Sequence, residues 1–277
     1  MVKKLDEAFM FTPDVLQSIK FQVEEGIGTI TINRPERFNA LNRQVLTELK
    51  SLLEHIQSTY NHQTMRGLLI TGEGEKAFIA GADIKEMSRM DTNQAVEFGR
   101  LGQTVTFLME KLPFVVIAMV NGHALGGGLE MAMSADFIFA TQNATFGAPE
   151  VKLGLIPGFG GTQRLAKILG RNLAKELIYS GRSLGAAEAQ EFGLVLRVYE
   201  SKEAMVKAAQ EWINNAAKNS LFAIEKAKQV MNAGNDLPLV DGLQHELSEF
   251  SAIFASDDMR EGTRAFLEKR TPQFVGK

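Results

Sequence analysis

The chain has 277 residues, of which 45% are hydrophobic and 23% are charged, and its formal net charge is −3. A chain of this length can bury a substantial core, either as one large domain or as a domain with an appendage. Charges of both signs are mixed along it and basic pairs such as Lys3-Lys4 are short, so the composition predicts no nucleic-acid partner.

The sequence contains no cysteine. This excludes disulfides, thiolate metal sites and a cysteine nucleophile, and it favours an intracellular, cytoplasmic protein. No signal peptide is expected, because Asp6 and Glu7 interrupt the basic start and no apolar run follows. The most apolar stretch, Phe114 to Val120, is too short to cross a bilayer and is typical of a buried strand, so membrane insertion is not expected.

The first half of the chain alternates strand and helix patterns. Two strands are predicted first, and a helix with apolar residues at helical spacing follows them. The predicted elements are strands Ile19 to Glu24 and Gly28 to Asn33, helix Arg43 to Tyr60, strand Arg66 to Thr71, a glycine-rich loop, a helix from about Thr92 to Leu112, and strand Phe114 to Asn121 before a short helix. This order predicts a mixed α/β architecture.

The second half repeats the alternation and then becomes helical. Strands are predicted near Phe137 to Ala140, at Thr145 to Gly147 and at Val195 to Tyr199, with helices between Gly161 and Ser180. From Glu203 onward the pattern is helical, over Lys202 to Ala217, Leu221 to Met231 and Leu237 to Leu267. The sequence therefore predicts an α/β core over residues 1–200 and a helical C-terminal region over residues 201–277.

A glycine-rich segment, Asn121 to Glu130, joins an apolar strand to a short helix. Its three consecutive glycines, residues 126–128, remove every side chain from the approach to the helix N-terminus. Bare N–H groups at such a terminus attract developing negative charge. The segment also fits a tight strand-to-helix turn that only packs against a neighbour.

A second turn of small residues lies at Phe78 to Asp83, which we interpret as a loop after a strand. Two such turns could supply two N–H donors to one oxygen atom, which is the arrangement of an oxyanion hole. Such a hole suits a reaction in which a thioester or ester carbonyl becomes an enolate or a tetrahedral oxyanion.

Two glutamates are candidates for the reacting groups. Glu130 lies in the first turn of the glycine-flanked helix, although a glutamate there can simply complement the helix dipole. Glu150 follows Pro149 in a turn after a strand, although it could equally be a solvated loop carboxylate.

Four segments resemble the signature blocks of the crotonase superfamily, the enoyl-CoA hydratase and isomerase family. They are Ala80 to Met87, Asn121 to Glu130, Gly147 to Gly154 and Ile156 to Leu165. The blocks occur in the expected order, and the likeness runs from about Gln22 to Phe274, which is nearly the whole chain.

The resemblance implies a spiral of ββα units with a helical C-terminal trimerisation region. It also implies coenzyme A thioesters as ligands, no separate cofactor and no metal, and a homotrimer or a dimer of trimers. The N–H groups of Ala82 and Gly127 are implied to hold the thioester oxygen. Because the superfamily performs several reactions with this one hole, the side chains must decide the activity.

Members that resemble true hydratases carry glutamates at both positions that match Glu130 and Glu150, whereas isomerases usually keep only the one matching Glu150. Hydration needs a base for the water proton and an acid that delivers a proton to Cα. The expected activity is therefore that of a hydro-lyase: syn addition of water to trans-2-enoyl-CoA, giving 3-hydroxyacyl-CoA as in fatty acid β-oxidation. An enoyl-CoA isomerase and a non-catalytic acyl-CoA-binding scaffold are the alternatives.

Residues that contact coenzyme A are also implied. Lys76 and Lys85 are expected near the nucleotide phosphates, the backbone from Phe38 through Ala40 to Leu41 at the adenine, and Ala80 as a further contact of coenzyme A. Phe266 and Lys269 resemble positions that reach the ligand of a neighbouring subunit. The chain departs from the vertebrate members at Glu36, where a lysine is often found, and this puts one phosphate contact in doubt. The depth of the acyl pocket is expected to depend on Ser88 to Glu97 and Leu155 to Phe159.

One rival pattern is a hydrolase triad. Gly181 to Gly185 has the spacing of a nucleophile elbow around Ser183, and Asp241 and His245 follow in the chain order of an α/β-hydrolase. However, the residues before Ser183 are predicted to be helical, and the other two candidates share one helix where separate loops are needed. The context therefore argues against this interpretation.

Overall fold

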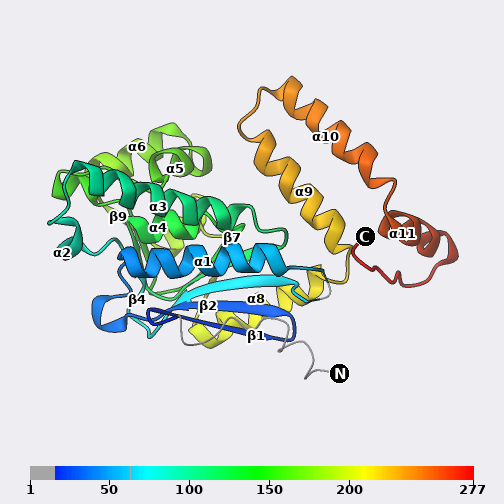
Figure 1. The fold of residues 1–277 in the computed structure, drawn as a ribbon, viewed down its shortest axis with the longest axis horizontal. Coiled ribbons are helices and arrows are strands. Elements are labelled where there is room, and N and C mark those ends of the chain that lie inside the picture. Colours follow the sequence, from blue (N-terminus) through cyan, green and yellow to red (C-terminus); the bar gives the residue numbers. More distant parts are fainter. Residues whose placement is uncertain (1–15, 63) are drawn as a thin grey trace.

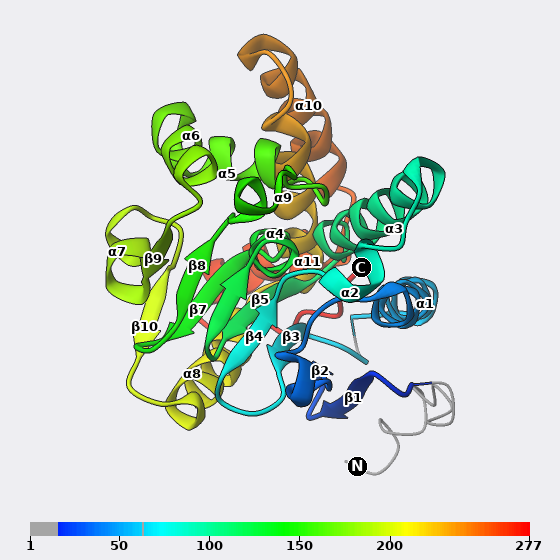
Figure 2. The same ribbon diagram turned by 90° about the vertical axis from the view of Figure 1, so that its left-hand side faces the viewer.

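The structure is a computed structural model that describes residues 16–62 and 64–277, so the expectations for the first seven residues lie outside the described part. Figure 1 shows the whole fold. Its larger sheet has six strands in the order β1-β2-β3-β5-β7-β10, which can be followed in Figure 2. Only β1 and β2 pair antiparallel, and the other neighbours are parallel. The strands are β1 Ile19–Glu24, β2 Ile27–Ile32, β3 Gly67–Gly72, β5 Val115–Val120, β7 Phe137–Thr141 and β10 Arg197–Tyr199.

The central strands of this sheet have both faces covered. Every residue of β3 and β5 is buried, which explains why both segments are uninterrupted apolar runs in the sequence. Leu68 and Ile70 face the core beneath α1 (Arg43–Thr59) and α3 (Thr92–Glu110). Leu69 faces the opposite way, toward α8 (Lys202–Ala216). Figure 2 shows these helices on the two sides of the sheet.

A second sheet of four short strands carries the glycine-rich turns. Its order is β4 (Ala77–Ala80), β6 (His123–Leu125), β8 (Thr145–Gly147) and β9 (Ser183–Gly185). The expectation of a plain loop over Phe78 to Asp83 is therefore wrong in its first half, because β4 pairs with β6. Strands β4, β6 and β9 have only three or four residues, too few for alternation to reveal them, whereas β8 coincides with the predicted strand Thr145 to Gly147. The parallel strands β4, β6 and β8 end together at one edge, where the small-residue turns meet.

The remaining elements surround this edge. They are the 3-10 helices η4 (Pro35–Arg37) and η5 (Glu150–Leu153), and helices α2 (Ile84–Met87), α4 (Gly127–Met133), α5 (Gly161–Leu169), α6 (Arg171–Ser180) and α7 (Ala186–Glu191). Helix α4 contacts β4 and β6 as well as β5 and β7, so it joins the two sheets. The predicted break between two helices in Gly161 to Ser180 is confirmed at Gly170, whose φ is +76°.

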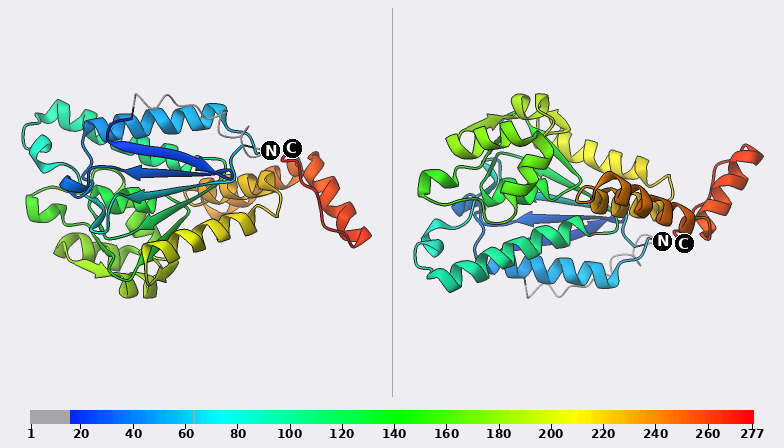
Figure 3. Two further views of the ribbon diagram at one scale, coloured as in Figure 1. Left: turned by 90° about the horizontal axis from the view of Figure 1, so that it is seen from below. Right: turned by 90° about the horizontal axis from the view of Figure 1, so that it is seen from above.

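The last three helices extend away from the sheets (Figures 1 and 3). They are α9 (Leu221–Gly234), α10 (Leu239–Ile253) and α11 (Asp257–Glu268). The expectation of one helical run from Leu237 to Leu267 is wrong, because Ser256 caps a new helix by accepting a hydrogen bond from the Met259 N–H. Since α8 still packs on the sheet, the division of the chain at residue 200 remains a proposal.

No helix in residues 16–62 and 64–277 combines the length and the apolar composition that a membrane crossing requires.

Gly128 is the tightest contact between α4 and β4. A Cβ atom there would lie 1.9 Å from the carbonyl oxygen of Ile79, so backbone would have to move. We expect Gly128→Ala to lower the free energy of unfolding by about 3 kcal/mol, measured by urea denaturation. Gly234→Ala is the control, because that helical glycine has open space around it and alanine there is expected to be neutral or mildly stabilising.

Candidate active site

An apolar cavity of about 630 Å3 opens at the edge of the second sheet. Ala82, Gly127, Glu130 and Glu150, the four residues predicted to react or to hold the thioester oxygen, all line it, and so does Ala80. The structure therefore brings together residues that are up to 70 positions apart in the chain, from Ala80 to Glu150. Their chemical roles remain predictions.

Part of the remaining cavity wall comes from the two segments expected to set its depth. Met90 and Ala95 represent the first segment, and Leu155, Ile156 and Phe159 represent the second. Both segments therefore line the cavity, and their role in shaping an acyl pocket remains a prediction. Ile156 is 73% exposed, so this part of the wall also reaches the surface.

The two small-residue turns lie side by side. A Cβ atom at Gly126 would be 3.8 Å from the Gly81 Cα, and one at Gly81 would be 3.5 Å from the Leu125 carbonyl oxygen. Gly126 has φ +51° and caps α4, a conformation in which glycine is strongly favoured. Gly127 is the first residue of α4, so its N–H has no acceptor in the preceding turn of the helix.

The N–H of Ala82 is left available by a single parallel bridge. The Leu41 N–H donates to the Gly81 carbonyl at 2.9 Å, and the Asp83 N–H donates to the Leu41 carbonyl at 2.7 Å. In a parallel bridge the residue between two such bonds turns its own N–H away from the paired strand. Ala82 therefore presents its N–H on the side opposite Leu41, while its residue lines the cavity.

Glu130 is almost completely buried, with 3% of its surface exposed. Its Oε1 accepts hydrogen bonds from the N–H groups of Phe159, at 2.8 Å, and Gly161, at 2.6 Å. A Cβ atom at Gly161 would lie 2.9 Å from the same oxygen, so only glycine allows this approach. Glu130 is thus held by N–H groups of a second loop. A glutamate that only complemented the dipole of its own helix would not need these contacts.

Glu150 begins η5 and lies beside the glycine turn. A Cβ atom at Gly126 would be 2.9 Å from Glu150 Oε1, so the carboxyl group lies against the bare backbone. Its Oε2 is buried and, within the described residues, has no hydrogen-bond partner. A buried carboxyl oxygen without a donor is costly when it is charged. The solvated-carboxylate interpretation of Glu150 is therefore not supported by its surroundings.

Both carboxyl groups hold protons more tightly than glutamates in water. The pKa of Glu130 is raised to about 7, mainly by burial and also by the charge of Glu150, while the N–H groups of Gly161 and Phe159 and the charge of Arg164 oppose the rise. Burial also raises the pKa of Glu150. Because the charge of Glu150 acts on Glu130, the two acids are expected to titrate as a coupled pair.

The raised pKa of Glu130 has a consequence for stability. Because its carboxyl group is harder to ionise in the folded protein than at its ordinary pKa of 4.5, the free energy of unfolding should fall as the pH rises from 4.5 to about 7. Glu130→Gln removes that cost and should be more stable than the wild type by about 3 kcal/mol above pH 7.

The check is urea denaturation of both proteins between pH 4.5 and 8. The stability difference should grow with pH and should vanish near pH 4.5. A variant that is less stable than the wild type at pH 8 would contradict the assignment of a buried, ionisation-resistant carboxyl group.

The two lysines expected near the phosphates of coenzyme A both lie on the surface. Lys76 is exposed in the turn before β4, and Lys85 is exposed on α2. Lys85 lines a small surface hollow of about 360 Å3 together with Arg43 and Arg89, and the carboxyl groups of Asp83 and Glu86 line it as well. These contacts remain predictions, since no observation of a ligand tests them.

The backbone segment expected to line the adenine lies next to β4, the strand that ends at the cavity with Ala80. Phe38 is 49% exposed and has φ +51°, and its carbonyl oxygen accepts a 3.0 Å hydrogen bond from the Ala80 N–H. The carbonyl oxygen of Ala40 accepts a 2.6 Å hydrogen bond from Arg34, which also pairs with Asp83. These bonds fix the 38–40 segment over β4.

Phe266 and Lys269 do not join the site within one chain. They lie at the end of α11, which Figure 1 shows at the opposite end of the molecule from α2. Phe266 is 82% exposed. If these residues contact a bound thioester, that thioester must belong to another copy of the chain, as the resemblance implies.

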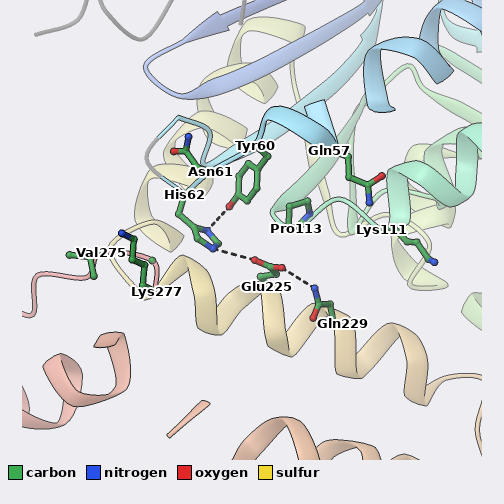
Figure 4. A pocket seen from close by; sticks show the side chains of 11 residues that line it. Gln57, Tyr60, Asn61, His62, Lys111, Pro113, Glu225, Gln229, Val275 and Lys277 are labelled. Atoms are coloured by element: carbon green, nitrogen blue, oxygen red, sulfur yellow. Dashed lines mark hydrogen bonds and ion pairs between the residues drawn. The ribbon is translucent and has the colours of Figure 1, made fainter. Parts of the chain in front are cut away.

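A second cavity, of about 660 Å3, lies between the end of α1 and helix α9 (Figure 4). In it the Tyr60 hydroxyl and His62 Nδ1 are 2.5 Å apart, and His62 Nε2 pairs with Glu225 at 3.2 Å. Burial raises the pKa of the Tyr60 hydroxyl well above its ordinary value. The phenol of Tyr60 is neutral, and Tyr60, His62 and Glu225 are engaged with one another through a hydrogen bond and an ion pair. This cavity therefore offers neither a nucleophile nor an anion hole, and the apolar cavity is the better candidate for the active site.

The rival triad is not assembled. Ser183 is exposed on β9 of the second sheet, whereas Asp241 and His245 lie on α10 in the C-terminal helical region (Figures 1 and 2). The prediction that the context is wrong for a hydrolase is confirmed. Among the residues that the structure describes, no group of three or more His, Asp or Glu side chains is arranged to hold a metal ion.

Comparisons with known proteins show the family to which the chain belongs. Residues 22–277 match the family model described as Enoyl-CoA hydratase/isomerase. The short-chain-enoyl-CoA hydratase of Clostridium acetobutylicum is 42% identical over 255 residues, 92% of this chain and 96% of that protein. The crotonyl-CoA hydratase of Syntrophomonas wolfei is 41% identical over 261 residues, 94% of this chain and 99% of that protein.

A solved structure gives the same answer for the fold. The crystal structure of enoyl-CoA hydratase from Bacillus anthracis has a TM-score of 0.88 and 38% sequence identity, over 94% of this chain and 100% of that chain. The chain belongs to the enoyl-CoA hydratase/isomerase family, the crotonase superfamily. The predicted superfamily, fold class and enzyme class, a hydro-lyase, are confirmed.

Proposed function

We propose that this enzyme adds water to trans-2-enoyl-CoA thioesters to form 3-hydroxyacyl-CoA. One observation carries the proposal: two carboxyl groups with raised pKa values, Glu130 and Glu150, line one apolar cavity beside two free backbone N–H groups. The names of the relatives in Clostridium acetobutylicum and Syntrophomonas wolfei support the same reaction.

In the proposed reactant state the carboxyl group of Glu150 carries a proton and that of Glu130 is ionised. The two N–H donors at Glu130 Oε1 favour the charged form of that group, whereas Glu150 Oε2 has no donor within the described residues. Glu130 takes a proton from the water molecule while the water oxygen bonds to Cβ of the thioester. Glu150 delivers its proton to Cα, and a proton passing from Glu130 to Glu150 resets the pair.

The N–H groups of Ala82 and Gly127 act on the thioester oxygen. When the water oxygen bonds to Cβ, the electron pair of the double bond moves toward this oxygen as an enolate. Donors already aimed at that position need no rearrangement during the step. The proposal places both carboxyl groups on one face of the acyl group, so that water and proton are added from that face, which is syn addition. The balanced reaction consumes only water and the thioester, and needs no separate cofactor.

The coenzyme is proposed to lie outside the cavity. Lys76 and Lys85 neutralise its phosphates, the 38–40 backbone lines its adenine, and the thioester enters beside Ala80. The cavity then holds the acyl chain. A series of trans-2-enoyl-CoA substrates from four carbons upward would show where kcat/KM declines and so measure the length of the cavity.

We also propose a homotrimer, or a dimer of trimers, in the cytoplasm. Helix α10 leaves large apolar side chains uncovered, and such a contiguous surface is characteristic of an interface. They are Leu239, Val240, Leu243, Leu247, Phe250 and Phe254, each at least half exposed. Fatty acid β-oxidation is the metabolic setting that this reaction suits.

The deciding experiment is an assay of the purified enzyme with crotonyl-CoA and, separately, with a 3-enoyl-CoA. We expect rapid loss of the conjugated thioester absorbance with crotonyl-CoA, and a 3-hydroxyacyl product. Conversion of 3-enoyl-CoA to a conjugated product without hydration would favour an isomerase. Tight binding of both thioesters without any turnover would favour the non-catalytic scaffold.

A further inference from the structure

The loop that holds Glu130 is itself held from behind by a buried ion pair. The carbonyl oxygen of Phe159 accepts a 2.9 Å hydrogen bond from Arg164 Nη1. The same guanidinium binds Glu110 through two bonds, Nε to Oε1 at 2.6 Å and Nη2 to Oε2 at 2.9 Å. Only 16% of the Arg164 side chain and 33% of the Glu110 side chain are exposed. A bidentate pair of this kind fixes both the place and the plane of the guanidinium.

The contacts of Phe159 divide between two directions. Its N–H and that of Gly161 point to Glu130 Oε1, while its carbonyl points to Arg164 and, at 3.2 Å, to the buried Thr106 hydroxyl. The peptide group between Phe159 and Gly160 therefore links the two donors that hold the carboxylate. Because Arg164 binds the carbonyl oxygen of this peptide group, it restrains the backbone from which both donors project.

Gly160 makes the arrangement possible. Its φ is +108°, and a Cβ atom there would lie 2.1 Å from Arg164 Nη1, so the guanidinium occupies the space of the missing side chain. N–H groups on either side of a left-handed residue form a concavity that binds anions. The sequence Phe159-Gly160-Gly161 followed by Arg164 thus builds an anion hole for Glu130 and the group that fixes its shape.

We infer that Arg164, clamped by Glu110, is a positioning residue for hydration: it aims the Phe159 and Gly161 N–H groups at Glu130 and keeps that carboxylate ionised. The inference rests on the proposed function of Glu130 as the base. It assigns no contact between Arg164 and the substrate, because Arg164 does not line the apolar cavity. Arg164 instead lines a separate hollow of about 620 Å3, on the other side of Phe159.

The charges near Glu130 predict the direction in which the pH dependence should move. Glu150 from η5 raises the pKa of Glu130, and Arg164 from α5 lowers it. Glu110 from α3 partly neutralises Arg164. Since the base must be ionised, loss of the Arg164 charge should move the acidic limb of kcat/KM to higher pH. Loss of the Glu110 charge should leave it in place or move it to lower pH.

The test uses the full-length Arg164→Met, Arg164→Lys and Glu110→Gln enzymes, with Lys167→Met as the matched control. Lys167 lies one turn further along α5 and lines the same hollow, but it pairs with Asp236 rather than with the loop. For Arg164→Met we expect kcat to fall about 10- to 100-fold with KM nearly unchanged. Its acidic limb should rise by about half a pH unit or more.

Arg164→Lys restores the charge but not the fork of donors. Its acidic limb should return close to that of the wild type while kcat stays reduced, which separates the charge of Arg164 from its geometry. Lys167→Met should behave as the wild type in both measurements. An Arg164→Met enzyme with a lower melting temperature but an unchanged limb and unchanged kcat per folded molecule would overturn the inference.

A second measurement does not depend on turnover. The carboxyl carbon of Glu130 can be titrated by 13C NMR in glutamate-labelled enzyme and assigned by its loss in Glu130→Gln. Its midpoint should rise in Arg164→Met and not in Lys167→Met; equal midpoints would overturn the inference. A wild-type enzyme that fails to hydrate crotonyl-CoA would instead contradict the proposed function, so the two failures are distinguishable.

Discussion

Glu150→Gln should lower kcat for crotonyl-CoA hydration by about 10³- to 10⁴-fold, with little change in KM. Glutamine keeps the size and polarity of the side chain but has no proton to deliver to Cα. The buried position of the Glu150 carboxyl group, with Oε2 unpaired among the described residues, means that little solvent can take over the role. Glu130→Gln should cause a loss of similar size, because its amide cannot accept the proton of water.

Steady-state kinetics at pH 7 to 8 check this result, with binding of the thioester measured separately. Glu191→Gln is a suitable control, since Glu191 is an exposed carboxylate on α7 away from the cavity lining. Retention of even a tenth of wild-type kcat by either catalytic variant would contradict its assigned proton transfer. The gain in stability expected for Glu130→Gln would show at the same time that the loss of activity is not a loss of folding.

Ala82→Pro should reduce kcat by about 10²- to 10³-fold, because proline has no N–H to offer the thioester oxygen. The bonds that fix this turn are made by Leu41 and Asp83, not by the Ala82 N–H, so the bridge itself does not need the missing donor. Circular dichroism and the melting temperature report whether the turn survives.

The control for this loss is Ala82→Ser, which keeps the backbone donor and changes only a small side chain. It should retain most of the activity. If the serine variant loses as much kcat as the proline variant in a folded protein, then the side chain rather than the N–H matters, and the proposed oxyanion hole is wrong.

Much of the fold was predictable because long apolar patterns report burial directly. The fully buried strands β3 and β5 are continuous apolar runs, and α1 repeats its buried residues at helical spacing. The short strands β4, β6 and β9 carry no such pattern, since a strand of three or four residues shows too little alternation. The break at Ser256 was missed for a related reason: a cap is one residue, and apolar periodicity continues on both sides of it.

The candidate site divides in the same way. Glu130, Glu150 and the glycine turns could be found because unusual residues stand close together in the sequence. The hold on Glu130 could not, since Phe159 and Gly161 act through backbone N–H groups, which the sequence does not display. A signal for it was present in Gly160, Gly161 and Arg164, but their meaning depends on a contact with Glu110 that lies 54 residues away from Arg164.

Hydration in heavy water tests the central claim most directly, that two carboxyl groups on one side of the acyl chain add a water molecule between them. With crotonyl-CoA and the wild-type enzyme, NMR of the 3-hydroxybutyryl-CoA product should show one deuterium at C2, on the same face as the new hydroxyl at C3. Addition of the two groups from opposite faces, or deuterium at C4 with a displaced double bond, would contradict the account.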